Sequence, residues 1–245
     1  MSSPQSFLKT FYARTPPFLT PLALVAVLAL AACDRNPESG AKPAPKPGAE
    51  KAAAPMASPP PAADVPKVIF LGDSLTAGLG VSVDEAFPAR VGEILAAEGH
   101  PIQVINAGVS GDISAGGSSR LAWLLSQKPA VVVVELGAND GMRGQPLAEL
   151  EKNLLDVVRR SQAAGAKVLI LGMKIPPNYG KDYSNGFEAI YPRIAKETGA
   201  ALVPFLLEGV GGEAELNQAD GIHPTAEGHK LVAKNVAPYL ARLLE

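Results

Sequence analysis

The sequence predicts an α/β domain in three layers, with helices on both faces of a five-stranded parallel sheet. Five short apolar runs are continuous rather than alternating, as in strands that are buried on both faces. A stretch with apolar residues three and four positions apart follows each run, which is the spacing of an amphipathic helix. Strands that alternate with helices in this way form parallel sheets with right-handed crossovers.

The expected elements follow one another in chain order. β-branched residues, which strands prefer, are frequent in every run except the last. The expected strands are KVIFLG (67–72), QVINAG (103–108), AVVVVELG (130–137), KVLILGM (167–173) and ALVPFL (201–206). The expected helices cover residues 88–98, 118–127, 147–164, 187–198 and 226–244.

Residues 1–32 have the features of a signal peptide. Lys9 and Arg14 precede an apolar stretch, 18–32, whose length suits a signal peptide better than a membrane span. The stretch ends in LAAC, which resembles a bacterial lipobox, so we expect cleavage before Cys33 and lipid attachment to its thiol. Cys33 is the only cysteine of the chain, so no intramolecular disulfide can form. The alternative is an ordinary secretory cleavage site with an incidental cysteine.

Residues 33–66 are expected to form a disordered linker. They are rich in proline, alanine and glycine and contain no periodic apolar face. The remaining residues, 67–245, suffice for one well-buried domain. Together these features predict a lipoprotein of the bacterial cell envelope that is anchored to a membrane and faces the periplasm. A net charge of −2 argues against a nucleic-acid partner.

Short polar motifs lie at the ends of the first three expected strands and after the fifth. They are GDS (72–74), NAGVSGD (106–112), GAND (137–140) and DGIHP (220–224). The carboxyl ends of parallel strands share one edge, at which α/β proteins bind their ligands. Glycine, asparagine, aspartate and serine are also ordinary turn residues, which would explain any single loop. Four such loops at one edge indicate an active site.

One of the three histidines fits a catalytic base. His100 precedes the second expected strand and so lies at the opposite edge of the sheet. His229 falls inside the last expected helix, where it packs or caps. Asp220 stands three residues before His223 and can fold back onto its ring, because Gly221 permits a tight bend. The sequence therefore favours His223 as the base and Asp220 as the acid that orients it.

Ser74 is the expected nucleophile, because the one cysteine lies outside the domain. We expect Asp73 to stabilise the turn rather than to react. The expected oxyanion donors are the backbone N–H groups of Ser74 and Gly111 and the side-chain amide of Asn139. Taken singly, Ser74 and Asp220 are as compatible with a helix cap or a turn.

The motifs GDSLTAG, NAGVSGD, GAND and DGIHP resemble, in order and spacing, the four sequence blocks of the SGNH hydrolase family. The resemblance implies a flavodoxin-like SGNH hydrolase fold over essentially the whole domain. It carries the family's roles of nucleophile, base and orienting acid onto Ser74, His223 and Asp220. It carries the role of oxyanion donor onto Gly111 and Asn139, together with the N–H of the nucleophile.

Within the family, the motifs are most similar to those of the bacterial thioesterase I, arylesterase and lysophospholipase L1 group. This likeness implies hydrolysis of carboxylic esters with aryl or short-to-medium acyl groups, and of acyl thioesters or lysophospholipids. It implies no cofactor and no metal.

Two other functions stay open, a carbohydrate O-deacetylase of the same fold and a lipid-tethered binding module without turnover. Residues 174–187, after the fourth strand, are expected to form a long loop that acts as a lid or acyl pocket, or else an ordinary surface connection. Met142 and Arg143 are expected at the mouth of the site. The oligomeric state does not follow from the sequence.

Overall fold

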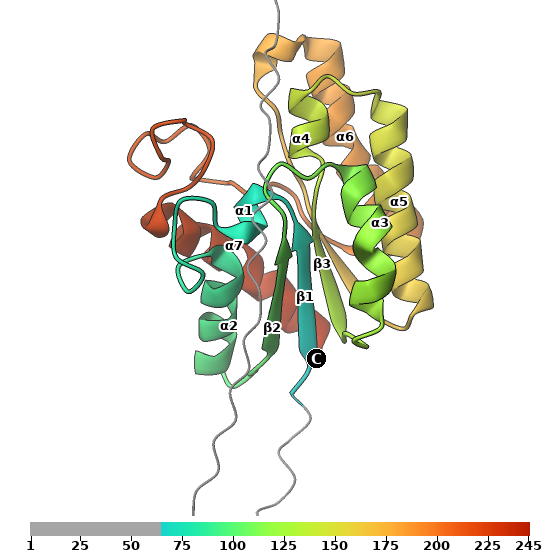
Figure 1. The fold of residues 1–245 in the computed structure, drawn as a ribbon, viewed down its shortest axis with the longest axis vertical. Helices are drawn as coiled ribbons and strands as arrows, with labels where there is room; N and C mark the ends of the chain where they lie inside the picture. Colours follow the sequence, from blue (N-terminus) through green and yellow to red (C-terminus); the bar gives the residue numbers. More distant parts are fainter. Residues whose placement is uncertain (1–64) are drawn as a thin grey trace, which may run out of the picture. The chain divides into compact units, whose positions relative to one another are not determined.

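The computed structural model describes residues 65–245, whose fold is drawn in Figure 1. The signal peptide, the lipidation of Cys33 and all but the end of the linker lie outside the described residues and stay predictions. Within residues 65–245, none of the helices is long and apolar enough to cross a membrane.

Five parallel strands form one sheet in the order β2-β1-β3-β4-β5. They are β1 (Lys67–Gly72), β2 (Gln103–Gly108), β3 (Val131–Glu135), β4 (Lys167–Leu171) and β5 (Ala201–Val203). Every residue of β3 and all but the first of β1 are buried, as their continuous apolar sequences predict.

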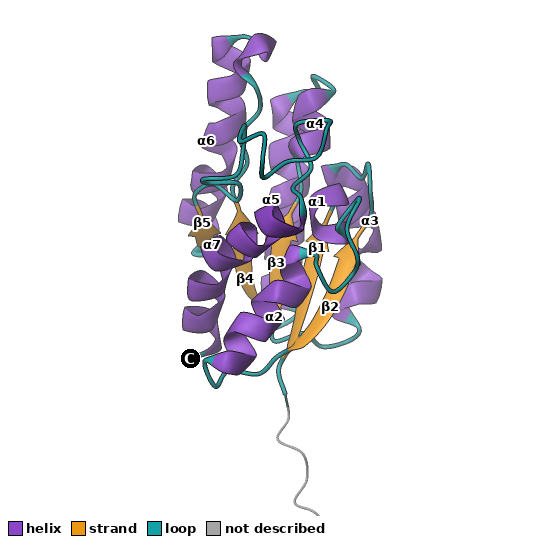
Figure 2. Cartoon of the chain, turned by 90° about the vertical axis from the view of Figure 1, so that its left-hand side faces the viewer, coloured by secondary structure: helices purple, strands orange, loops and turns teal. Residues whose placement is uncertain are grey.

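Helices cover both faces of the sheet. The longer ones are α2 (Phe87–Ala97), α3 (Ser114–Leu125), α5 (Leu147–Ala163), α6 (Lys181–Thr198) and α7 (Ala226–Leu244). Short helical turns are α1 (Ser74–Ala77), α4 (Ala138–Met142) and the 3₁₀ turn η1 (Pro177–Tyr179). Helices α2 and α7 pack together on one face, and α3, α5 and α6 lie on the other (Figures 1 and 2). The predicted three-layer fold with a five-stranded parallel sheet is confirmed.

Several expected boundaries are wrong. Strand β5 ends at Val203, because the next residue, Pro204, has no N–H to donate to the sheet. Helix α3 begins at Ser114 and not at residue 118, because the carboxylate of Asp140 accepts hydrogen bonds from both the N–H and the hydroxyl of Ser114. This acceptor belongs to α4, so the sequence near Ser114 does not reveal it.

Helix α6 begins at Lys181, six residues before the expected start. Its first turns are held by the hydroxyl of Tyr183, which donates a hydrogen bond to the carbonyl of Gln145. Phe187 and Tyr191 then bury the next turns in the core. The second half of the expected 174–187 loop is therefore helical.

Candidate active site

Ser74 stands where β1 turns into the short helix α1. The carboxylate of Asp73 accepts a hydrogen bond from the N–H of Leu75 at 3.0 Å and thereby caps this helix. Gly72 is required by the close approach of its neighbours, since a Cβ there would lie 2.0 Å from Oγ1 of Thr76. The expectation that Asp73 stabilises the turn is confirmed.

Asp220 and His223 lie in the loop between β5 and α7. Oγ of Ser74 is 2.8 Å from Nε2 of His223, and Nδ1 of His223 is 2.7 Å from Oδ2 of Asp220. The φ angle of Gly221 is 74°, a left-handed conformation that lets the Asp220 carboxylate fold back onto the ring. The structure thus joins Ser74 to a residue 149 positions later in the chain.

Hydrogen bonds hold the loop that carries His223. Asn217 and Pro224 form an isolated antiparallel bridge across it. The N–H of Gln218 donates to the carbonyl of His223 at 2.7 Å, and the side-chain amide of Gln218 donates to the carbonyls of Leu79 and Pro224. These bonds tie the loop to itself and to the segment that follows α1.

Asp220 is ionised at neutral pH. The backbone N–H groups of Ile222 and His223, together with the His223 ring, lower the pKa of Asp220 from 3.8 to about 2. The carboxylate therefore accepts the proton on Nδ1 of His223, which leaves Nε2 as an acceptor toward the Ser74 hydroxyl. In this tautomer His223 is placed to remove the proton of Ser74.

Two further hydrogen-bond donors lie at the same edge of the sheet, one in α4 and one in the loop after β2. Asn139 is the second residue of α4, and its Nδ2 donates to Oδ2 of Asp73 at 3.0 Å. A primary amide has two N–H groups, so one is left for a ligand. Gly111 lies in the loop after β2 with a φ of 79°. Within residues 65–245, the backbone N–H groups of Ser74 and Gly111 donate to no protein acceptor.

Arg120 of α3 connects three segments of the site. Its guanidinium donates hydrogen bonds to the carbonyl of Gly72, the carbonyl of Ala107 and the carboxylate of Asp112. Gly72 ends the strand that leads to the nucleophile, and Asp112 directly follows Gly111. One side chain therefore joins the ends of β1 and β2 to the loop that carries Gly111.

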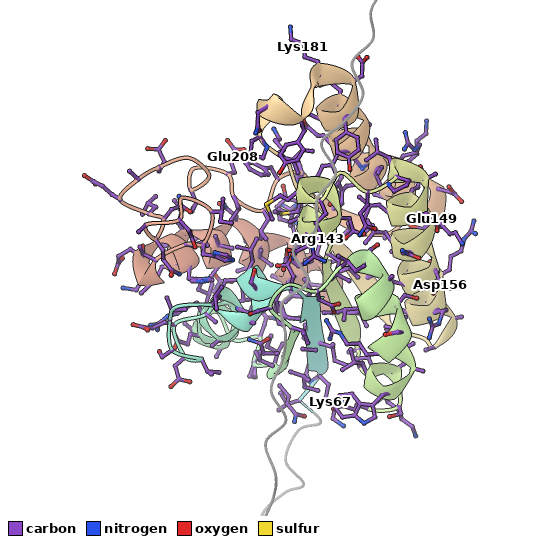
Figure 3. All side chains as sticks on the ribbon, turned by 45° about the horizontal axis from the view of Figure 1, so that its top comes forward. Lys67, Arg143, Glu149, Asp156, Lys181 and Glu208 are labelled. Carbon is purple, nitrogen blue, oxygen red and sulfur yellow. The ribbon has the colours of Figure 1, made fainter. Side chains whose placement is uncertain are left out.

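Arg143 contacts the loop that carries Gly111, an expected oxyanion donor. Its Nη2 donates to the carbonyl of Gly111 at 2.9 Å and does not line the cavity, whereas Met142 does. Figure 3 shows Arg143 at the end of the sheet opposite Lys67, where β1 begins. Arg143 thus links the end of α4 to the loop after β2.

The other two histidines lie where the sequence predicts. His100 is exposed and falls between α2 and β2, at the amino-terminal edge of the sheet. His229 is buried in α7, and its Nδ1 accepts a hydrogen bond from the N–H of Phe87 at 3.2 Å. This bond satisfies an N–H at the start of α2, whose own N-cap residue, Ala86, has no side-chain acceptor.

A cavity of about 230 Å³ opens beside Ser74. Asn139 and His223 contribute to its polar end. The apolar lining side chains include Met142, Met173, Ile175, Phe205, Leu207 and Ile222. Of the expected specificity segment, residues 174–176 line the cavity. Within residues 65–245, no group of three side chains could hold a metal ion.

Two further residues of the site, Glu135 and Arg120, are not predicted from the sequence. Glu135 ends the apolar run VVVVE, and its carboxylate is buried beneath the turn that holds Ser74, where it accepts a hydrogen bond from the N–H of Asp73 at 3.2 Å. A charged residue in an otherwise apolar strand indicates a buried group that needs polar partners. Nothing in the local sequence marks Arg120, because its acceptors lie in other segments.

A serine, a histidine and an aspartate that are linked in this way beside an apolar cavity form the arrangement of a serine hydrolase. The chain belongs to the GDSL-like lipase/acylhydrolase family, whose sequence model matches residues 70–231. The resemblance that the four motifs indicate is thereby confirmed.

Known relatives match 72 to 75% of the chain. It is similar to esterase TesA of Pseudomonas aeruginosa, with 47% identity over 178 residues, 72% of this chain and 89% of the relative. Thioesterase 1/protease 1/lysophospholipase L1 of Escherichia coli is 39% identical over 184 residues, 75% of this chain and 87% of the relative. The crystal structure of psychrotrophic esterase EstA from Pseudoalteromonas sp., inhibited by monoethylphosphonate, matches with a TM-score of 0.69 and 36% identity. That match covers 73% of this chain and 98% of EstA.

Proposed function

We propose that the protein is a serine esterase in which Ser74, His223 and Asp220 act as a catalytic triad. Its class, carboxylic ester hydrolase, follows from its family and from the esterases among its relatives. The observation that carries the residue assignment is the hydrogen-bonded chain from Ser74 Oγ through the His223 ring to the Asp220 carboxylate. This chain ends beside an apolar cavity that can receive an acyl group.

In the proposed reaction, Oγ of Ser74 attacks the acyl carbon while Nε2 of His223 takes the hydroxyl proton. His223 then gives this proton to the leaving alcohol or thiol, and an acyl-enzyme remains on Ser74. Water, deprotonated by the same ring, hydrolyses the acyl-enzyme. Throughout, ionised Asp220 keeps the proton on Nδ1 and stabilises the imidazolium.

The negative charge on the acyl oxygen requires hydrogen-bond donors. We assign this role to the backbone N–H groups of Ser74 and Gly111 and to the amide of Asn139. Both backbone groups lack a protein acceptor within the described residues, and the Asn139 amide keeps one N–H beyond its bond to Asp73. Each such donor typically contributes about 3 kcal/mol to the transition state.

The cavity favours aryl or short-to-medium acyl groups as substrates. Its walls are mostly apolar, so they suit a hydrocarbon better than the hydroxyl-rich surface of a sugar. This argues against the carbohydrate O-deacetylase that the motifs alone leave open. The names of the relatives add acyl thioesters and lysophospholipids as candidate substrates.

The test is turnover of a nitrophenyl ester series from acetate to palmitate, with the matching thioesters beside it. Wild-type protein is expected to hydrolyse the shorter esters, and Ser74→Ala to lose turnover while keeping its circular dichroism spectrum. A fluorophosphonate probe should label the wild-type protein and not Ser74→Ala. If Ser74→Ala keeps near-wild-type turnover, the nucleophile assignment is wrong. Labelling without turnover of any ester would favour a binding module, and release of acetate from acetylated xylan would favour the deacetylase.

We also propose that Cys33 is lipidated and anchors the protein on the periplasmic side of a membrane. The support is the order of positive residues, apolar stretch and LAAC in residues 1–33. At about 3.1 Å per residue, an extended proline-rich linker over residues 33–66 would reach on the order of 100 Å. Wild-type protein is expected in the membrane fraction, and Cys33→Ser is expected to be released or left uncleaved. A wild-type protein free in the periplasm, with a mature terminus other than Cys33, would exclude the anchor.

A further inference from the structure

Glu135 is a buried carboxyl group that the proposed mechanism does not use. It ends β3 and pairs in register with Gly72 of β1, the residue before Asp73 and Ser74. The side chain is 1% exposed, and a Cβ on Gly72 would lie 2.6 Å from its Oε2. The missing side chain of Gly72 therefore makes the space in which the Glu135 carboxyl lies.

One oxygen of Glu135 holds the turn of the nucleophile. Oε2 accepts a hydrogen bond from the N–H of Asp73 at 3.2 Å and another from the hydroxyl of Thr76 at 2.8 Å. These donors belong to residues on either side of Ser74 in the sequence, so the Glu135 carboxyl stabilises the turn that holds Ser74. Asp73 in turn accepts from the amide of Asn139 at 3.0 Å. Glu135 is thereby connected through Asp73 to Ser74, the next residue, and to Asn139, an expected oxyanion donor.

The other oxygen, Oε1, is buried, and no donor within residues 65–245 contacts it. A buried ionised oxygen without a donor is strongly unfavourable, whereas a protonated carboxyl needs only an acceptor. Asp73 is a second buried carboxyl group beside it, since the N–H of Asp73 donates to Oε2, and two neighbouring carboxyl groups do not both ionise. We infer that Glu135 is a positioning residue that acts in its neutral form and holds the Ser74 turn through Oε2.

The surroundings of Glu135 agree with a neutral group. Burial and the neighbouring charge of Asp73 raise the pKa of Glu135 well above its usual value. The pKa of Asp73 is raised by burial, but hydrogen bonds from Leu75 N–H, Glu135 and Asn139 oppose this change and favour its ionised form. The hydroxyl of Tyr191 of α6 donates to the carbonyl of Leu136, next to Glu135, and burial raises its pKa, so this hydroxyl stays neutral. The pKa of Glu135 is therefore raised more strongly than that of Asp73.

The decisive comparison is Glu135→Gln with Glu135→Leu in the full chain. A carboxamide reproduces the neutral acid, because it carries no charge and its oxygen can accept from the Asp73 N–H and the Thr76 hydroxyl. Glu135→Gln is expected to keep kcat within about threefold of wild type and to unfold at no lower temperature. Glu135→Leu fills the space without an acceptor, and kcat should fall about 10- to 100-fold with KM unchanged, as for a displaced catalytic group.

Two controls separate positioning from general stability. Ser161→Ala removes a buried hydroxyl that bonds within α5 and should leave kcat unchanged. If Glu135→Leu does not fold, Thr76→Val replaces it, because this variant removes one donor to Oε2 while keeping the shape of the side chain. Its kcat should fall about threefold or more with KM unchanged. Equal loss of kcat in Glu135→Gln and Glu135→Leu, or failure of Glu135→Gln to fold, would overturn the neutral form. Unchanged kcat in the Leu variant, or in the Val variant that replaces it, would overturn the positioning role.

Infrared difference spectroscopy supplies a readout that does not depend on turnover. Wild-type protein at pH 7 should show the C=O stretch of a protonated carboxyl, which moves in D₂O and is absent in Glu135→Gln. Absence of that band in wild-type protein would contradict the inference. The kinetic readouts rest on the proposed function, whereas the band does not. Turnover by Ser74→Ala would therefore refute the proposed function and leave the protonation state of Glu135 to be decided by the spectrum.

Discussion

Acidification should destabilise the domain through His229, the buried histidine of α7. Its side chain is 1% exposed, its Nδ1 accepts the N–H of Phe87, and its ring stacks on the Phe87 ring with centroids 6.3 Å apart. Burial lowers the pKa of His229 from 6.5 to about 4, and the nearby His223 contributes in the same direction. A proton on Nδ1 would also remove the acceptor for Phe87.

The size of the effect follows from the two pKa values. At pH 7.5 His229 is neutral in both the folded and unfolded states, so it adds no dependence on pH. As the pH falls below 6.5, the unfolded chain binds a proton that the folded chain does not, and the free energy of unfolding decreases. The loss continues until the folded state is protonated at a pH of about 4. At about 1.4 kcal/mol per pH unit, the total loss is about 3 kcal/mol.

The assay is urea denaturation of the full chain between pH 4.5 and pH 8, with His229→Asn as the matched variant. Asparagine retains an acceptor for the Phe87 N–H but does not titrate in this range. The variant should be less stable than wild type at pH 8, and the difference should shrink by about 2 to 3 kcal/mol as the pH falls to 4.5. Carboxyl groups titrate alike in both proteins and cancel in the difference. A constant difference over this range would refute a neutral, buried His229.

Three further substitutions test the proposed site. Asn139→Ala should lower kcat on a nitrophenyl ester by about 100- to 1,000-fold with little change in KM. An effect confined to KM would instead make Asn139 a substrate-binding residue. His223→Ala should be about as damaging as loss of the nucleophile, whereas His100→Ala should keep nearly full kcat; equal losses in the two variants would contradict the base assignment. Gly72→Ala should destabilise the fold by about 1 to 3 kcal/mol in thermal denaturation, because its methyl group would overlap Oγ1 of Thr76, and an unchanged melting temperature would show that the turn adapts.

The strands could be predicted because each buried strand is a continuous apolar run bounded by turn residues. The short helices α1 and α4 could not, because four or five residues contain too few turns for a helical period to show. The sequence predicts a later start for α6, because the prolines and glycines of residues 174–187 favour a loop, while the bond from Tyr183 to Gln145 that stabilises the actual start is tertiary.

The candidate site also contains residues that the sequence reveals and residues that only the structure reveals. Ser74, Asp220 and His223 stand out because their residue types fit one reaction and their loops share one sheet edge. The supporting residues do not stand out, since Glu135 and Arg120 acquire their partners only through the strand register and the packing of α3. A sequence pattern therefore locates groups that react, and the structure is needed to locate the groups that hold them.

The separation of Ser74 from His223 has a consequence for biosynthesis. Ser74 emerges from the ribosome 149 residues before its partner His223, which lies in a loop that closes through Gln218 and leads into α7. A growing or truncated chain therefore carries a serine with no base, and such a hydroxyl is a weak nucleophile. In the proposed mechanism, ester turnover therefore requires that the loop of His223 has been synthesised and has closed on Ser74, and shorter chains lack the base.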